Sequence, residues 1–114
     1  MSTIDAQEIR DLGQGETLIF SGCFKPAING ATISSVSSVV QASGPGTLTI
    51  GSATINSGST VTVDGIVQPL GTVVQVDVSA PANTATAGNY RLDFFVVTSA
   101  GETVTLRAWI RVTA

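Results

Sequence analysis

The chain has no histidine and one cysteine, Cys23, and only 11% of its 114 residues are charged. Histidine is a frequent general base and zinc ligand, so its absence excludes most catalytic and metal-binding constellations. A single thiol cannot form an intrachain disulfide, which fits a protein made in a reducing cytosol. We therefore expect no metal, no other cofactor and no enzymatic activity.

Long apolar runs are also absent, although 43% of the residues are apolar. No segment approaches the roughly 18 consecutive apolar residues of a membrane-spanning helix. Residues 1–10 carry Asp5 and Glu8 and lack the apolar core of a secretory signal. The net charge is −3, whereas nucleic-acid binding needs clustered Lys and Arg. The sequence thus predicts neither a membrane nor a nucleic acid as a partner.

Thr, Ser, Val and Gly together make up close to half of the chain, and strong helix formers are scarce. This composition predicts an all-β fold. Alternating apolar runs, separated by clusters of Gly, Pro, Asn and Ser, predict a β-sandwich of about seven antiparallel strands. The predicted strands cover residues 17–24, 31–41, 47–50 with a continuation through 55 left open, 60–67, 72–79, 89–99 and 102–113.

Residues 1–15 are predicted to form a short N-terminal arm, followed by the β-sandwich domain over residues 16–114. The Ser2 to Asp5 stretch resembles a capping box that opens a short helical turn, with Ile4, Ile9 and Leu12 loosely on one side. The segment is too short to fold alone. It is either a frayed terminus or an arm that becomes ordered against a partner, and the second interpretation makes its three apolar residues candidate interface residues.

Charge is nearly missing between residues 26 and 90, where only Asp64 and Asp77 occur. Monomeric β-domains usually protect their sheet edges with Lys, Pro or inward-pointing charges. Their scarcity here predicts a homo-oligomer in which neighbouring subunits cover some edges. The alternative is a monomer whose rows of Ser and Thr suffice for solubility.

The last two predicted strands can be read in register. A three-residue turn at 99–101, with Gly101 in the left-handed conformation, joins them in a common hairpin geometry. This register places apolar residues opposite one another on one face, whereas a two-residue turn would scatter them over both faces. The apolar pairs are Tyr90 with Ile110, Leu92 with Ala108, Phe94 with Leu106, and Val96 with Val104.

The other face of this hairpin places Asp93 opposite Arg107 and Arg91 opposite Trp109. We expect an ion pair between the first two residues and a cation–π contact between the second two. With two neighbouring apolar side chains, Trp109 forms a group suited to an interface anchor. The alternative is that the N-terminal segment or the 81–88 loop covers this group. The candidate protein-interface residues of this hairpin are Arg91, Phe95, Val97 and Trp109.

Few residues suggest catalytic chemistry. Cys23 lies within a predicted strand, where a buried and unreactive thiol is expected rather than a nucleophile. The Asp64-Gly65 pair is typical of a turn or a bulge, and Asp77 is expected to face solvent. The spacing of the carboxylates does not favour an acid–base pair.

The stretch Ala87-Gly88-Asn89-Tyr90 resembles the entry to the penultimate strand of immunoglobulin-like sandwiches. In those domains a Tyr hydroxyl at this place donates a hydrogen bond back to the backbone and fixes the corner. The predicted fold is therefore an immunoglobulin-like β-sandwich.

Four stretches carry a wider likeness: Asp11-Leu12 with Gly15-Glu16, residues 29–35, residues 87–92, and residues 98–103 with Leu106 and Val112. Between Leu12 and Val112 the chain resembles small virion accessory proteins of tailed bacteriophages, among them fiber-tail adaptors, neck proteins and capsid decoration proteins. The resemblance implies a homo-oligomeric structural role in the virion, without a cofactor, for a protein made in the host cytoplasm.

These observations predict a non-enzymatic structural protein of a tailed-phage virion, an adaptor-type subunit that joins or reinforces neck, tail or capsid components. A capsid cement or decoration protein is the alternative within the structural class. A carbohydrate or cell-surface binding module is the alternative from another class. Aromatic residues, at 5% of the chain, offer few platforms on which sugars could stack.

Overall fold

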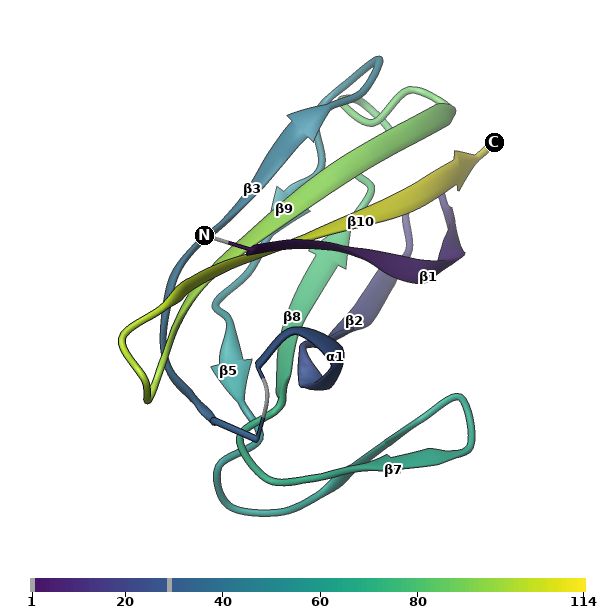
Figure 1. The fold of residues 1–114 in the computed structure, drawn as a ribbon. Helices are drawn as coiled ribbons and strands as arrows, with labels where there is room; N and C mark the ends of the chain where they lie inside the picture. Colours follow the sequence, from purple (N-terminus) through teal and green to yellow (C-terminus); the bar gives the residue numbers. More distant parts are fainter. Residues whose placement is uncertain (1, 29) are drawn as a thin grey trace.

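The computed structural model describes residues 2–28 and 30–114, without the side chains of Ser2, Gln7 and Glu8. In this part of the chain, ten strands and one short helix follow one another. Figure 1 labels all of them except β4 and β6. Their bounds are β1 (Ser2–Gly13), β2 (Thr17–Cys23), α1 (Lys25–Ile28), β3 (Ile33–Ser43), β4 (Thr49–Ile50), β5 (Thr54–Ile55), β6 (Val61–Val63), β7 (Ile66–Gln68), β8 (Val73–Ser79), β9 (Gly88–Thr98) and β10 (Thr103–Thr113). The expectation of a predominantly β protein is confirmed.

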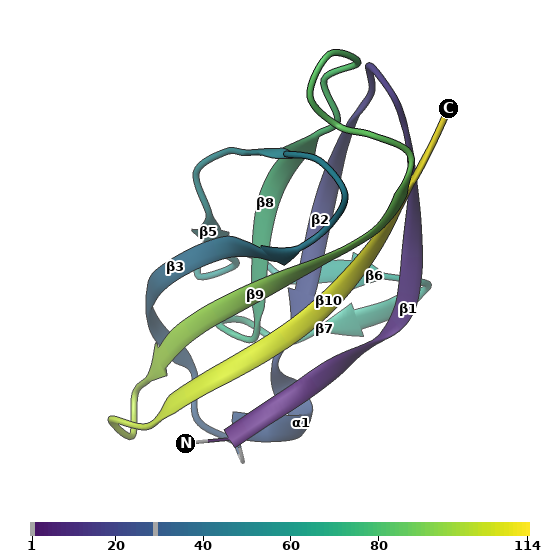
Figure 2. The ribbon, with the colours of Figure 1, turned by 90° about the horizontal axis from the view of Figure 1, so that it is seen from above.

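The strands form three sheets. Sheet A has the order β1-β10-β9-β3, and sheet B has the order β2-β8-β4, with β5 also paired to β8. Strands β6 and β7 form a separate hairpin that projects below the two larger sheets in Figure 1. Figure 2 shows the four strands of sheet A side by side in one layer, with β2 and β8 behind them. The expected count of about seven strands is wrong, because the described residues form ten. The expected antiparallel arrangement holds for every pair except β1 with β10, which is parallel.

The core lies between sheets A and B, because alternate residues of each strand face the other sheet. The rings of Phe20 on β2 and Phe94 on β9 meet with centroids 5.6 Å apart. Each buried side chain of this size contributes about 1.5–3 kcal/mol of hydrophobic stabilisation. The largest fully buried side chains are Tyr90, Phe24, Phe94, Leu92, Leu106 and Ile110, followed by valines of β8, β9 and β10.

The predicted hairpin register is confirmed. Strand β9 pairs with β10 so that Phe94 lies opposite Leu106 and Tyr90 opposite Ile110. The amide of Thr98 donates to the carbonyl of Glu102 at 2.9 Å, and Gly101 has a φ of 80°. The left-handed glycine allows the chain to reverse within three residues, because a side chain at that position would be strained.

The N-terminal helical turn is wrong, because residues 2–13 form β1 at the edge of sheet A. Strand β1 runs parallel to β10, with Ile4 opposite Leu106 and Leu12 opposite Val112. The spacing of apolar residues in this segment fits both a loose helix and a strand with a bulge, and the register does shift between Asp5 and Ile9. Pairing to the exposed edge of β10 decides between them. The boundary between arm and domain at residue 15 stays a prediction.

Residues 60–67 do not form the single predicted strand. They divide into β6 and β7 around Asp64 and Gly65, which have φ values of 51° and 78°. Two successive residues with positive φ make the tight turn that matches the twist of a hairpin. The turn interpretation of Asp64-Gly65 is therefore confirmed. The stretch 47–55 likewise forms two short strands, β4 and β5, and the turn after β2 contains α1.

Tyr90 forms the expected corner. Its hydroxyl donates to the carbonyl of Thr86 at 2.6 Å, and its side chain is fully buried. The loop Gly44-Pro45-Gly46 packs against it so closely that a Cβ at Gly46 would lie 2.3 Å from the carbonyl oxygen of Thr84. Glycine at this position is thus required by the close approach of two loops.

Candidate functional site

The outward face of sheet A carries an apolar group in the middle of the sheet. Trp109 on β10 lies opposite Arg91 on β9 and opposite Ile9 on β1, so the three form a row across three strands. Phe95 and Val97 alternate with buried residues along β9 and therefore share this face. All five side chains are at least partly exposed, and Ile9 is 62% exposed. We call Ile9, Arg91, Phe95, Val97 and Trp109 the outer patch.

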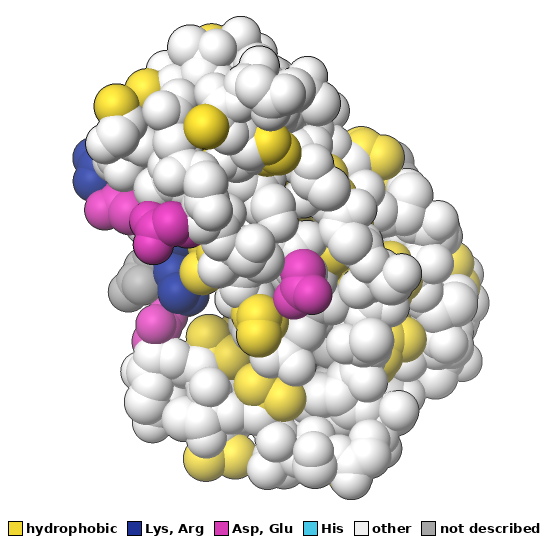
Figure 3. Space-filling view, turned by 180° about the vertical axis from the view of Figure 1, so that it is seen from behind, with side chains coloured by type: hydrophobic (Ala, Val, Ile, Leu, Met, Phe, Trp, Pro, Cys, Tyr) yellow, Lys and Arg dark blue, Asp and Glu magenta, His cyan; other side chains and the backbone are white. Residues whose placement is uncertain are grey.

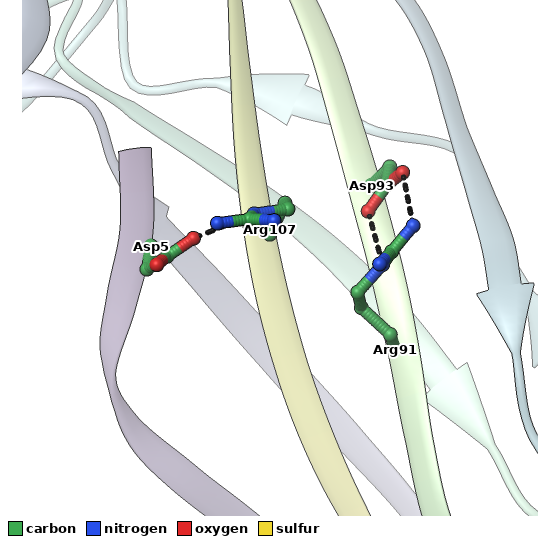
Figure 4. Close-up of polar contacts among 4 residues, drawn as sticks. All are labelled: Asp5, Arg91, Asp93 and Arg107. Carbon is green, nitrogen blue, oxygen red and sulfur yellow. Dashed lines mark hydrogen bonds and ion pairs between the residues drawn. The ribbon is translucent and has the colours of Figure 1, made fainter. Parts of the chain in front are cut away.

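The polar contacts around the outer patch differ from those predicted. Arg107 binds Asp5 on β1, with Nε 2.7 Å from Oδ1, and Arg91 binds Asp93 on its own strand at 3.1 Å (Figure 4). The guanidinium that lies over the Trp109 ring, 5.8 Å from its centroid, is that of Arg107. The predicted Asp93–Arg107 ion pair and the predicted Arg91–Trp109 stacking are both wrong. The predicted register is correct, but β1 places Asp5 beside Arg107 and these two residues form an ion pair. Asp93 therefore pairs with Arg91 on its own strand.

The charges on this face cancel in pairs. Arg111 donates two hydrogen bonds to Asp11 on β1, at 2.8 and 3.0 Å. Hydrogen bonds with Asp5 and Asp11 raise the pKa of Arg107 and Arg111 above the ordinary arginine value, so both guanidinium groups stay protonated. The charges of three ion pairs, all within the described residues, cancel on this face. The pairs of Arg107 and Arg111 stabilise the fold little because they are exposed. The three pairs are Asp5 with Arg107, Asp11 with Arg111, and Asp93 with Arg91.

Only one of the three candidate residues of β1 reaches the outer patch. Leu12 is 3% exposed and belongs to the core between the sheets, and Ile4 packs against that core from the same side of β1. Ile9 faces the other way, beside Trp109. The structure therefore brings together Ile9 with the four residues predicted on the hairpin, and leaves Ile4 and Leu12 outside that surface.

Val40 extends the outer patch and was not predicted from the sequence. It lies on β3 opposite Asp93 and is 42% exposed. Its neighbour Val39 packs against the core. Two adjacent valines in a strand must point to opposite faces, so the sequence Val39-Val40 already indicated that one of the two faces outward. The three register shifts along β3 made it impossible to tell from the sequence which of the two faces outward.

A groove of about 670 Å³ lies on the other side of β1 from the outer patch. Four segments that are far apart in the sequence line it, namely β1, β2 with α1, the β6–β7 hairpin and one residue of β10. Figure 3 shows hydrophobic side chains gathered in the hollow above the hairpin, with a basic side chain beside them. The sequence gives no local signal for a surface that only the fold assembles.

Cys23 lines this groove and is partly exposed, so the expectation of a buried thiol is wrong. Cys23 ends β2 at the free edge of sheet B, where one side is open. Burial, and to a smaller extent the charge of Asp64, raise the pKa of the Cys23 thiol above its ordinary value. At neutral pH the thiol is therefore protonated and weakly nucleophilic. Asp77 is exposed, as expected.

Among the side chains that the structure describes, no three of His, Cys, Asp or Glu come together in a way that could hold a metal ion. None of the helical segments described is both long and apolar enough to cross a bilayer. No buried side-chain nitrogen or oxygen in the described residues lacks a hydrogen-bond partner. The polar groups of the interior are thus engaged in holding the fold.

No protein-family model matches the chain, and no curated protein matches it significantly. Among solved structures, the solution structure of amebosin matches over 98% of this chain and 97% of that chain, with 15% sequence identity and a TM-score of 0.40. A likeness this distant carries no functional argument.

Proposed function

We propose that the chain is a non-enzymatic structural subunit of a tailed-phage virion that binds other proteins, including copies of itself, through the outer patch. The observation that carries this proposal is the position of Trp109, partly exposed at the middle of a broad sheet face among other apolar side chains. Aromatic residues and Arg are enriched in protein interfaces, and Trp and Arg are among the residues most enriched at their centres. The role within the virion is that of an adaptor that joins or reinforces neck, tail or capsid components.

The paired charges around the outer patch support contact with protein rather than with a small ion or nucleic acid. Arg107 and Arg91 are each neutralised by a carboxylate, so another surface can cover them without leaving an isolated charge. Rim charges of this kind contribute specificity and orientation, while the apolar centre supplies most of the affinity.

We also propose an immunoglobulin-like sandwich as the fold, which suits a structural module. The support is the hydrogen bond of the Tyr90 hydroxyl to Thr86, in the place where such domains fix their corner, and the packing of two sheets over one core. The phage resemblance of the sequence supports the virion as the setting, with a decoration protein as the alternative position. A sugar-binding module is less well supported, because aromatic residues make up only 5% of the chain and Arg107 lies over one face of the Trp109 indole.

The substitution Trp109→Ala tests the proposal. The wild-type chain is expected to self-associate in sedimentation velocity, and the variant is expected to associate at least about ten-fold more weakly because it lacks the interface anchor. Its far-UV circular dichroism should be unchanged, since Trp109 lies outside the core.

The matched control is Ile19→Ala, which truncates a 61% exposed apolar side chain on the outward face of sheet B. It should associate like the wild type. A wild-type monomer that is retained on a glycan column would favour the binding module, and equal losses in both variants would refute the assignment to the outer patch.

A further inference from the structure

The groove beside β1 runs along the free edge of β2. Successive residues of a strand point to opposite faces of its sheet. The groove is nevertheless lined by Phe20, Ser21 and Cys23, which lie on both faces of β2. Only a space alongside the edge of β2 can contact both Phe20 on one face and Ser21 and Cys23 on the other. Strand β2 pairs with β8 on its other side, and within the described residues it has no second partner.

Backbone groups of β2 point into this space. The amide of Ala80 donates to the carbonyl of Glu16, and the amide of Phe24 donates to the carbonyl of Thr72. Both bonds join residues opposite one another in the β2–β8 register, so the even-numbered residues of β2 face β8. The N–H and C=O groups of Ser21 and Cys23 therefore point away from β8, toward the groove.

Strand β2 is the one long edge of the described structure that carries none of the usual protections. At the edges of sheet A, β1 bears ion-paired charges and β3 has three register shifts. On the far side of β8, the edge consists of two-residue strands, β4 and β5. Strand β2 has seven residues in an unbroken register, with no charge and no proline. Such an edge is a template for another strand.

The walls of the groove fit an amphipathic strand. Phe20 and Leu106 extend into it from the core, and Ile66 and Val67 of the hairpin line it although they are 64% and 61% exposed. The charged residues of the groove are Asp5, Arg10, Lys25 and Asp64. Asp5 is neutralised by Arg107, whereas no ion pair among the described side chains joins Arg10, Lys25 or Asp64, so two unpaired cations face one unpaired carboxylate.

We infer that this groove binds an extended acidic segment of a partner protein, which adds a strand to the edge of β2. The segment hydrogen-bonds to the backbone of Ser21 and Cys23. Its apolar side chains cover Phe20 and the hairpin, and its carboxylates pair with Arg10 and Lys25. Main-chain hydrogen bonds give this mode its affinity, and alternate side chains give its specificity.

The test uses the full chain labelled with nitrogen-15 and a capped heptapeptide of alternating Val and Glu as the probe. Titration is expected to shift the amide signals of residues 19–25 and 63–68, which surround the groove. A peptide with Lys in place of Glu should bind at least about five-fold more weakly, because charge pairing is lost and repulsion replaces it. A Val–Glu peptide N-methylated on the edge that would face β2 should cause no shifts, because it cannot form the strand bonds.

Protein variants give a second measurement. The double variant Arg10→Gln, Lys25→Gln should weaken binding of the Val–Glu peptide about five-fold, while Arg111→Gln, which removes one charge outside both surfaces, should change it less than two-fold. Ser21→Pro should abolish binding, since it removes an amide from the free edge, where proline is tolerated. The wild-type titrations stand on their own if that variant fails to fold.

Three results would overturn the inference: no shifts at millimolar peptide, shifts centred on another surface, or equal binding of the Val–Glu, Val–Lys and N-methylated peptides. Self-association that Ser21→Pro abolishes, without peptide binding by the wild type, would instead make a second copy of this chain the occupant and would refute an acidic partner. The groove and the outer patch lie on opposite sides of β1, so each proposal can fail without the other.

Discussion

At the scale of single residues, the corner around Tyr90 shows how a close approach dictates residue type. The hydroxyl of Tyr90 binds the 81–88 loop through Thr86, and Gly46 lies against both. Gln41 joins the same region, because its side chain binds the carbonyl of Gly46 and the amide of Leu48. Two loops and the ends of β3 and β9 are thus held by one buried tyrosine and one amide side chain.

The substitution Gly46→Ala is expected to destabilise the protein by about 1–3 kcal/mol, because the new methyl group would collide with backbone atoms of residues 84 and 86. Chemical denaturation in urea measures the change in the free energy of unfolding. Gly58→Ala is the control: no atom lies within 4 Å of its added Cβ, so its effect should stay within about 0.5 kcal/mol. Similar free energies for the two variants would show that the loops can separate at no cost.

At the scale of elements, β1 combines two functions in one edge strand. Leu12 closes the core between the sheets, while Ile9 and Asp5 face outward beside Trp109 and Arg107. Alternation along the strand places the core residues on one face and the outward residues on the other. The register shift between Asp5 and Ile9 leaves Asp5 opposite Arg107 and Ile9 opposite Trp109, so both still face outward.

We therefore expect Leu12→Ala to lower the free energy of unfolding by about 2–4 kcal/mol, through the lost burial and the cavity left behind. Ile9→Ala, on the same strand, should change it by about 0.5 kcal/mol or less because Ile9 is mostly exposed. Thermal unfolding followed by circular dichroism compares the two. If Leu12→Ala unfolds at the wild-type temperature, β1 does not contribute to the core.

The elements that could be predicted from the sequence are those whose partners are close in the chain. The β9–β10 hairpin has a single tight turn and two strongly alternating strands, so its register followed from the turn length and from apolar pairs such as Phe94 with Leu106. Strand β1 pairs with β10 across about a hundred residues, and its apolar spacing is ambiguous. Long-range pairing decided its conformation, and no local pattern carries that information.

The site illustrates the same limit at a finer level. The sequence predicted four outer-patch residues correctly as neighbours on one face, but it assigned Arg107 and Arg91 to the wrong partners. Arg107 lies opposite two carboxylates, Asp93 on β9 and Asp5 on β1, and it forms its ion pair with Asp5. Contacts between charged side chains depend on every strand nearby, whereas in a strand without register shifts, such as β9, the face on which a residue lies follows from the alternation of that strand.

At the scale of the whole molecule, the protection of sheet edges is uneven. Strand β2 has no charged residue, although it lies outside the charge-poor stretch 26–90 from which unprotected edges were predicted, while β1 is lined by Asp5 and Asp11 with their arginines. Coverage of edges by neighbouring subunits stays a prediction. A subunit with one open edge and one apolar sheet face can take part in two contacts at once. Whether those contacts build an oligomer stays a prediction, tested by the sedimentation experiment above.

The neutral pairing of charges around Trp109 sets how each surface should respond to ionic strength. Dissolved ions screen unpaired charges but have little to screen where each arginine already has its carboxylate. Raising sodium chloride from about 50 to about 500 mM should change the self-association constant less than two-fold, and should weaken peptide binding near Arg10 and Lys25 several-fold. Sedimentation measures self-association and isothermal titration measures peptide binding at both salt concentrations. If self-association proves more sensitive to salt than peptide binding, the two surfaces have been assigned the wrong kinds of partner.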